Sequence, residues 1–303
     1  MMKKTLCLLC LVAVSCLHAE PAKYYAPKAS APPVIDGKLD DACWQAAPER
    51  TGFTELGKAR YVDCQTFLRV LWDDKHVYVG LKAMEPMMDK LVVSGGGLWN
   101  DDSIEIFVAL PSGYGQHAIN TAGSQWGREK QTQGWQGKAF KGDGFYSVEL
   151  AIPFADLGVR PEHNTYVRAN FDRNRRTLGK DQCVHSCWSP NKKGFHEPEH
   201  FGQIVFVDAV PADWPDPFVA TVDKELAQFR RRLGESKRLC EVGLPLALCK
   251  AKVEPFAKLI AEFEQKSSSD RLEDRLTARA LIPQIEARQN DVRYAVLTAE
   301  LFE

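Results

Sequence analysis

The chain has 303 residues, of which 39 are basic and 40 are acidic, so its formal net charge is -1 at neutral pH. This length can form one large domain or two modest ones with a sizeable core. The balanced charge excludes broad electrostatic capture of nucleic acid or of an anionic membrane surface. We therefore expect an uncharged partner and no nucleic acid.

Residues 1–19 have the pattern of a secretory signal peptide. Lys3 and Lys4 precede an apolar run over 6–17, and the small residue Ala19 ends the segment. A second interpretation is a lipoprotein cleavage box at 13–16, in which Cys16 is acylated and retained as a lipid anchor. After residue 20 no apolar run approaches the roughly 20 residues of a transmembrane helix. The sequence thus predicts a secreted or periplasmic protein, or one tethered by lipid at Cys16.

Residues 30–208 contain short alternating segments separated by turn residues. Alternation over 66–72 and 77–81, around a turn at 73–76, predicts a hairpin. Further strands are predicted at 103–109, 116–121, 145–152, 166–171 and 203–207, and a single helical turn at 153–157. Many strands at this spacing, with hardly a helix between them, predict a mainly β fold, an antiparallel β-sandwich of the jelly-roll-like kind.

Beyond this region the pattern changes to that of an α-helical C-terminal tail. A proline-rich linker is expected over 209–217, followed by amphipathic helices over 218–303. Apolar residues recur at helical spacing over 219–233, 246–263 and 272–285. Pro255 predicts a kink or a new helix start, and the residues 267–270 predict an N-terminal cap. The tail can pack within the chain, which is the default, or serve as a docking element.

Six cysteines follow the signal segment. Their even number permits disulfides, and the two sequence-local pairs, Cys183 with Cys187 and Cys240 with Cys249, are the easiest to close. The alternative is that all of them are buried free thiols. No histidine lies at zinc-finger spacing from these cysteines, so a structural zinc site of that kind is not expected.

Residues 99–107 combine an indole with three carboxylates at the start of a strand. Trp99 can stack on the apolar face of a sugar ring, and Asp101, Asp102 and Glu105 can accept hydrogen bonds from its hydroxyls. The alternation places Ser103, Glu105 and Phe107 on one face and residues 104, 106 and 108 on the other, facing the core. The alternative is a core tryptophan beside a solvated acidic turn.

Several blocks of this region, in order between 34 and 207, resemble the family 9 carbohydrate-binding modules, which occur attached to secreted glycan-degrading enzymes. The helical tail lies outside the resemblance. The blocks are Ile35–Asp40 with Trp44, Arg69–Asp74 with Val77–Val79, Trp99–Phe107, Gly144–Pro153, Asn170–Arg173, Trp188–Ser189 and Phe195–Gly202.

The resemblance implies that two aromatic side chains clamp the end of a sugar chain. Trp99 matches the first aromatic wall and Phe195 the second, where characterised members carry a tryptophan. Glu105 matches the acidic hydroxyl acceptor, and Asn120 is expected to project toward the same groove. Ala118 stands where those members carry an arginine, so this chain departs from the family at two positions.

The glycine-rich segment 123–137 carries two more tryptophans, Trp126 and Trp135. Trp126 is a candidate extra platform for sugar, and its alternative is packing against the sandwich. No cofactor is required for sugar binding. A structural calcium ion at Asp101 and Asp102 is left open, although no twelve-residue calcium loop is present.

Three other chemistries are compared with sugar binding. Residues 196–200 match the letters of the zinc-protease pattern H-E-x-x-H, but Pro198 disfavours the helix that this pattern requires. A glycosidase needs two facing carboxylates, and no second acidic cluster stands opposite residues 101–105. Haem-binding relatives of such sandwiches would use Met84, Met87 or Met88 as axial ligands, although methionines after a strand more often fill gaps.

The sequence therefore predicts a non-catalytic protein that binds the end of a polysaccharide or oligosaccharide. Its setting is polysaccharide degradation, with a glycan-degrading enzyme as the expected protein partner. The rival is a structural or assembly protein whose sandwich has lost its sugar site and whose helices bind a partner.

Overall fold

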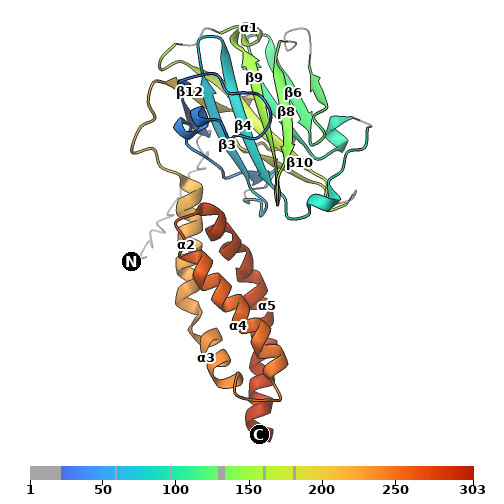
Figure 1. Ribbon diagram of the computed structural model, residues 1–303, viewed down its shortest axis with the longest axis vertical. Coiled ribbons are helices and arrows are strands. Elements are labelled where there is room, and N and C mark those ends of the chain that lie inside the picture. The colour runs from blue at the N-terminus through green and yellow to red at the C-terminus, as the bar shows by residue number, and fades with distance from the viewer. Residues whose placement is uncertain (1–21, 59, 96, 129–133, 160–161, 180–181) are drawn as a thin grey trace, which may run out of the picture.

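The computed structural model describes residues 22–58, 60–95, 97–128, 134–159, 162–179 and 182–303. The expected signal segment and Cys16 lie outside these residues. A two-sheet β region is followed by an elongated group of helices that extends away from it (Figure 1). A mostly β protein with a helical C-terminal region is therefore confirmed. None of the described helices combines the length and the apolar character needed to cross a bilayer.

Two sheets face each other in the β region (Figure 1). The first is antiparallel, in the order β3 (Thr66–Trp72), β4 (His76–Met84), β9 (Phe145–Pro153) and β8 (Gln136–Lys141). The second has the order β1 (Lys23–Pro27), β12 (Gly202–Val207), β10 (Tyr166–Arg175), β5 (Ser103–Leu110), β6 (Gly113–Asn120) and β7 (Gln125–Gly127). The short strand β11 (Val184–Cys187) pairs with β10 and with β2 (Thr54–Glu55).

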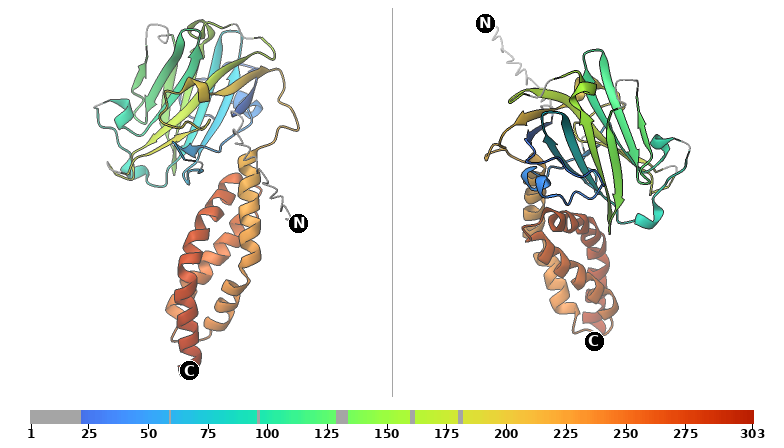
Figure 2. Two further views of the ribbon diagram at one scale, coloured as in Figure 1. Left: turned by 180° about the vertical axis from the view of Figure 1, so that it is seen from behind. Right: turned by 45° about the horizontal axis from the view of Figure 1, so that its top comes forward.

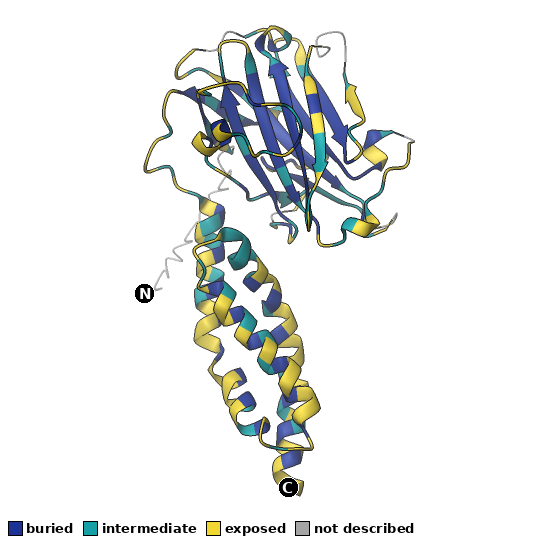
Figure 3. Cartoon of the chain, in the orientation of Figure 1, coloured by how far each residue is buried: buried dark blue, intermediate teal, exposed yellow. Residues whose placement is uncertain are grey.

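The core lies between the sheets, as the alternation of β5 predicts. Ile104, Ile106 and Val108 belong to the buried cluster shared by both sheets. Phe107, on the opposite face of β5, packs with Phe195 in a second cluster, which covers the outer side of this sheet. Figure 3 shows that the long central strands are buried along most of their length, whereas the edge strand β8 is largely exposed or intermediate. Both faces of β5 are therefore buried, and a polar side chain on its outer face needs a hydrogen-bond partner.

The hairpin predicted around residues 73–76 is present and has a clear local cause. The Asp73 carboxylate accepts hydrogen bonds from the backbone N–H groups of Lys75 and His76, at 2.7 Å each. This side chain substitutes for backbone partners in a tight turn. The helical turn α1 (Phe154–Leu157) also follows the expected pattern, because Gly158 ends it in the left-handed conformation.

The sandwich departs from a purely antiparallel arrangement at one edge. β1 runs parallel to β12, with Lys23 opposite Gln203. It also precedes residue 30, where the sandwich was expected to begin. The pairing joins the two ends of the β region, and no local alternation signals such a long-range contact. The strand β7 and the first two residues of β8 lie in the segment 123–137, for which the sequence predicts a glycine-rich loop.

Four helices make up the C-terminal region (Figure 2). They are α2 (Pro217–Arg232), α3 (Gly234–Gly243), α4 (Lys250–Ser267) and α5 (Leu272–Phe302). Their apolar faces form one common core, which includes Leu226, Phe256 and Ile285. The helices thus pack on one another, and the short helix α3 is an addition to the predicted stripes.

Two details of the predicted tail are wrong. The new helix start expected at Pro255 is wrong, because Pro255 lies inside α4 between the buried residues Val253 and Phe256; the alternative of a kink stays a prediction. The expected cap at 267–270 is also absent, since α5 begins after Arg271 without a side-chain capping bond. By contrast, α2 has the usual arrangement, in which the Asp216 carboxylate accepts the N–H groups of Phe218 and Val219.

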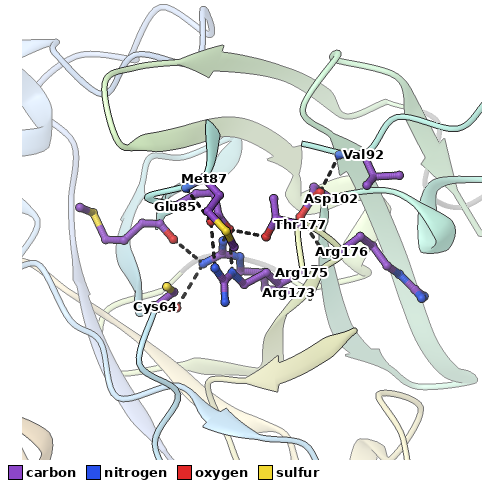
Figure 4. A network of polar contacts seen from close by, with 10 residues as sticks. Cys64, Glu85, Met87, Val92, Asp102, Arg173, Arg175, Arg176 and Thr177 are labelled. Carbon is purple, nitrogen blue, oxygen red and sulfur yellow. Dashed lines mark hydrogen bonds and ion pairs between the residues drawn. The ribbon is translucent and has the colours of Figure 1, made fainter. Parts of the chain in front are cut away.

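A buried ion network joins the two sheets where β10 ends. Glu85, which is fully buried, accepts hydrogen bonds from Arg173, Arg175 and Thr177 (Figure 4). The N–H of Met87 adds a further donor, at 3.1 Å. Burial alone raises the pKa of Glu85, but the hydrogen bond from Arg175 and the charges of both arginines outweigh it and lower that pKa. Glu85 is therefore ionised in the folded protein.

Replacing Glu85 by glutamine should destabilise the fold strongly. The variant leaves two buried guanidinium groups without a counter-charge, and we expect a loss of about 3–5 kcal/mol in the free energy of unfolding. Because folding lowers the pKa of Glu85, this stabilisation is present above the ordinary pKa of 4.5 and is lost as the pH falls through the folded value. Urea denaturation at pH 7 and in acid measures both effects.

The matched control is Asp74→Asn, which removes the carboxylate of an exposed pair with Lys28. Its unfolding midpoint should stay close to that of the unmodified protein, because exposed ion pairs contribute little. Equal destabilisation by both variants would contradict the proposed role of the buried network.

Candidate functional site

A hollow of about 250 Å³ opens on the outer face of the second sheet. Its floor is formed by polar side chains of β5, β6, β10 and β11, and aromatic side chains stand at its sides. The lining residues are Leu56, Trp99, Glu105, Gln116, Asn174, Arg176, His185, Phe195 and His196.

A chain of hydrogen bonds across four strands forms the floor. Glu105 on β5 accepts from Gln116 on β6, at 2.5 Å, and from Asn174 on β10, at 2.6 Å. The side-chain oxygen of Asn174 then lies 2.6 Å from Nδ1 of His185 on β11. Glu105 is only 4% exposed, so these two amide donors compensate for most of its lost hydration. The floor is therefore a fixed polar surface.

The same chain fixes the protonation of His185. Because the Asn174 amide nitrogen donates to Glu105, its oxygen is the acceptor, and His185 must carry its proton on Nδ1. Burial, followed by the nearby charge of Arg176, lowers the pKa of His185. His185 is thus a neutral imidazole at physiological pH, and it donates to the floor.

The first wall is Trp99, which lies in the 3-10 turn η3 (Leu98–Asn100) and is 48% exposed. Its carbonyl oxygen accepts a hydrogen bond from the Arg176 guanidinium at 2.7 Å. The neighbouring carboxylate of Asp102 accepts the backbone N–H groups of Val92 and Arg176. The turn that carries the indole is therefore tied to β10 at two points.

The second wall is Phe195, which is 8% exposed and lies in the segment before β12. The Phe195 ring packs against the ring of Phe107, and the His185 ring contacts Phe195 edge-on, with 5.6 Å between ring centroids. The segment is fastened by Asn191, whose amide donates to the carbonyl oxygens of Gly194 and Phe195. Trp99 and Phe195 thus reach one hollow from segments far apart in the sequence.

The structure brings three of the five sequence-predicted residues together in this hollow: Trp99, Glu105 and Phe195. The expectation that Asn120 projects into it is wrong. Its side chain donates to Asp101 and accepts the N–H groups of Ala122 and Ser124, so it fastens the turn after β6. Trp126 lies on β7 and contacts Trp99 edge-on at 5.8 Å, so it supports the first wall without lining the hollow.

The predicted sugar site did not include five polar residues of the floor and rim, which are Gln116, Asn174, Arg176, His185 and His196. β10 was predicted to end at residue 171, whereas it continues to Arg175. Extending its alternation by four residues would have placed Asn174 on the same face as Asn170. No local pattern signals His185, because β11 is a strand of four residues that was not predicted.

Other sequence hypotheses can be compared with the structure. Residues 198–200 form one 3-10 turn, so the helix required by the zinc-protease pattern is absent there. Asp101 and Asp102 accept hydrogen bonds from Ser94, Asn120 and backbone N–H groups. Calcium binding at these carboxylates stays an untested prediction. Haem binding also stays untested, and Met88 packs against the sandwich core.

All six cysteines of the described chain are free thiols. Cys183 immediately precedes β11 and Cys187 ends it. Four residues of strand separate Cα atoms by about 13 Å, whereas a disulfide needs less than about 7 Å. The extended backbone therefore rules out this pairing. Cys240 and Cys249 are buried in the helical core.

The chain belongs to the family described as "Carbohydrate family 9 binding domain-like", whose model matches residues 35–209. The resemblance drawn from the sequence blocks is thereby confirmed. The endo-1,4-beta-xylanase A of Thermotoga neapolitana is 27% identical over 183 residues, which are 57% of this chain and 17% of that protein. The enzyme of the same name from Thermoanaerobacterium saccharolyticum is 25% identical over 57% of this chain and 15% of its own length. The chain thus spans less than a fifth of these curated relatives.

Two solved structures share the fold of the β region. Both are a family 9 carbohydrate-binding module of Caldicellulosiruptor kristjanssonii, one in complex with cellotriose and one with glucose. The TM-scores are 0.51 for the cellotriose complex and 0.52 for the glucose complex, each at 19% sequence identity. Each match covers 65% of this chain, and the two matches cover 98% and 100% of the solved chains. At this identity the likeness shows the fold alone.

A buried acid lies next to the floor. Asp172 on β10 stands opposite Glu105 on β5 and opposite Cys187 on β11. Its two carboxyl oxygens are buried and receive no N–H or O–H donor from the described residues; the group that faces them is the thiol of Cys187, a weak donor. Burial raises the pKa of Asp172 well above its ordinary value; the Cys187 thiol opposes this shift, and the charge of Glu105 adds to it. The fold therefore favours the protonated form of Asp172.

Asp172→Asn should stabilise the protein increasingly as the pH rises above 4. In the unfolded chain Asp172 ionises near its ordinary pKa of 3.8, whereas the folded protein must keep the proton. Between the two pKa values the unmodified protein loses about 1.4 kcal/mol of stability per pH unit at this site. Asparagine does not titrate, so the variant has no pH-dependent loss of stability at this site. Urea denaturation of both proteins from pH 4 to pH 7 measures the difference, and parallel pH profiles would refute the assignment.

Proposed function

We propose that the sandwich is a non-catalytic module that holds the end of a sugar chain between Trp99 and Phe195. The observation that carries this proposal is the convergence of these two aromatic side chains on one hollow above a fixed polar floor. Aromatic faces suit the C–H face of a pyranose, and fixed polar groups select the orientation of its hydroxyls. Membership of the family and the sugar complexes of its structural neighbours support the same ligand class.

The size of the hollow favours a chain end over a long chain segment. Its volume of about 250 Å³ is below the roughly 300–1,000 Å³ of pockets that enclose drug-sized ligands. We infer that one terminal sugar residue occupies it and that the rest of the chain leaves toward solvent.

Arg176 supplies the guanidinium that Ala118 lacks. It lines the hollow from the end of β10, and its Nε is buried without a hydrogen-bond partner among the described residues. Glu105 already accepts from two amide groups, so we expect Arg176 to be the principal donor to sugar hydroxyls. This arrangement compensates from a different strand for the arginine that characterised members carry at position 118.

The proposal does not include catalysis. Within the described chain, Glu105 is the one carboxylate that lines the hollow. Glycoside hydrolysis uses a pair of carboxyl groups on either side of the scissile bond. The xylanase relatives support a setting in polysaccharide degradation. We further propose export of the chain by its N-terminal segment, with a glycan-degrading enzyme as its working partner.

Trp99→Ala should weaken glycan binding at least tenfold without unfolding the protein. Half of the indole is already exposed, so the fold loses little, while a ligand loses its stacking surface. A tenfold loss corresponds to about 1.4 kcal/mol. Isothermal titration with cellotriose and with xylo-oligosaccharides measures the affinity, and circular dichroism checks the fold.

The matched control is Tyr166→Ala, which removes an aromatic side chain that is 53% exposed at the start of β10, outside the lining of the hollow. It should leave the affinity unchanged. If the unmodified protein and both variants behave alike with every glycan, the rival function gains support, namely a structural or assembly protein that uses its helices to bind a partner.

A further inference from the structure

Within the sequence His196-Glu197-Pro198-Glu199-His200, His196 lines the hollow, whereas Glu197, Glu199 and His200 are not among its lining residues. The letters of this sequence match a zinc-protease pattern, in which both histidines lie on one helical face. In the structure the two histidines separate. His196 lines the hollow, and its Nδ1 contacts the hydroxyl of Tyr114 at 2.8 Å, whereas His200 ends the 3-10 turn over Pro198–His200.

A different set of ligand groups comes together on this turn. Glu197, Glu199 and His200 each offer one ligand atom, and these atoms all lie within 4.8 Å of one another. Ligands of one tetrahedral zinc ion are bound at about 2.0–2.2 Å, which places them roughly 3.5 Å apart. Small rotations of the exposed Glu199 side chain would therefore close the set around one ion.

The turn is held in place without a metal ion. The Glu197 carboxylate accepts the backbone N–H groups of Lys192 and Lys193 at 2.6 and 3.2 Å. The N–H of His200 donates to the carbonyl oxygen of Glu197 at 2.9 Å. The carbonyl oxygen of His200 accepts the hydroxyl of Ser189 at 2.6 Å. Such outer contacts orient metal ligands before the ion binds, which raises affinity.

The donor set selects the class of ion. Zinc and related transition metals accept both imidazole nitrogen and carboxylate oxygen ligands, and a water molecule can fill the fourth position of a site with three protein ligands. Calcium prefers six to eight oxygen ligands, so the imidazole of His200 argues against it.

We propose that Glu197, Glu199 and His200 bind one divalent transition-metal ion, with zinc as the expected ion. The site lies on the segment that carries Phe195 and His196 to the hollow, two residues beyond the second wall. Bound metal would add to the hydrogen bonds that already hold this segment. The metal proposal can be tested separately from the proposed sugar binding, because the zinc titration needs no glycan.

The test is a titration of the full chain with zinc in a buffer that does not chelate metals, followed by metal analysis after dialysis. We expect one zinc ion per chain. His200→Gln and Glu199→Gln should each weaken zinc binding at least tenfold. Glu199 is exposed, so its variant is expected to fold even if the histidine variant does not. Calcium in excess should not displace the zinc.

The matched control is His163→Gln. His163 is a half-exposed histidine that pairs with Asp208 at 3.1 Å. Among the described residues it belongs to no group of three or more side chains that could hold a metal ion. This variant should bind zinc as the unmodified protein does. The proposal is overturned if no zinc is retained, if Glu199→Gln binds normally, if the control loses zinc equally, or if calcium displaces it.

Discussion

The fully buried Glu85 carboxylate is the constraint on which the candidate site depends. It accepts hydrogen bonds from Arg173 and Arg175, which project inward from the last residues of β10. Successive side chains of a strand point to opposite faces, so this inward pairing turns Asn174 outward. Asn174 then joins Glu105 on one side to His185 on the other. A charge pair inside the sandwich thus fixes the polar floor outside it.

The same strand also positions the first wall. Immediately after β10 the backbone N–H of Arg176 reaches the buried Asp102 carboxylate, and its guanidinium reaches the carbonyl oxygen of Trp99. Arg175 and Thr177 bind Glu85 while Arg176 between them binds Asp102 and Trp99, so the backbone of 175–177 links the buried charge to the turn that carries the indole. The second wall has a separate support, because Phe195 is packed against Phe107. The hollow is preorganised by groups that never contact a ligand, which reduces the entropy cost of binding.

Much of the sandwich could be predicted, because one face of each long strand is apolar and period-2 alternation reports this directly. The alternation of β5 placed Ile104 in the core and Glu105 on the outer face, as observed. Partners across the sheet could not be predicted. Asn120 was expected in the groove because it lies on a neighbouring strand, yet its amide groups are used by a local turn. His185 and Arg176 reach the hollow only through pairings of β10 that depend on distant residues.

A crystal structure of the chain with a bound oligosaccharide such as cellotriose tests the central claim most directly. The account predicts a terminal sugar ring between the side chains of Trp99 and Phe195, with its hydroxyls toward Arg176 and the floor around Glu105. A sugar bound on any other surface, with the hollow between the two aromatic rings empty, would contradict it.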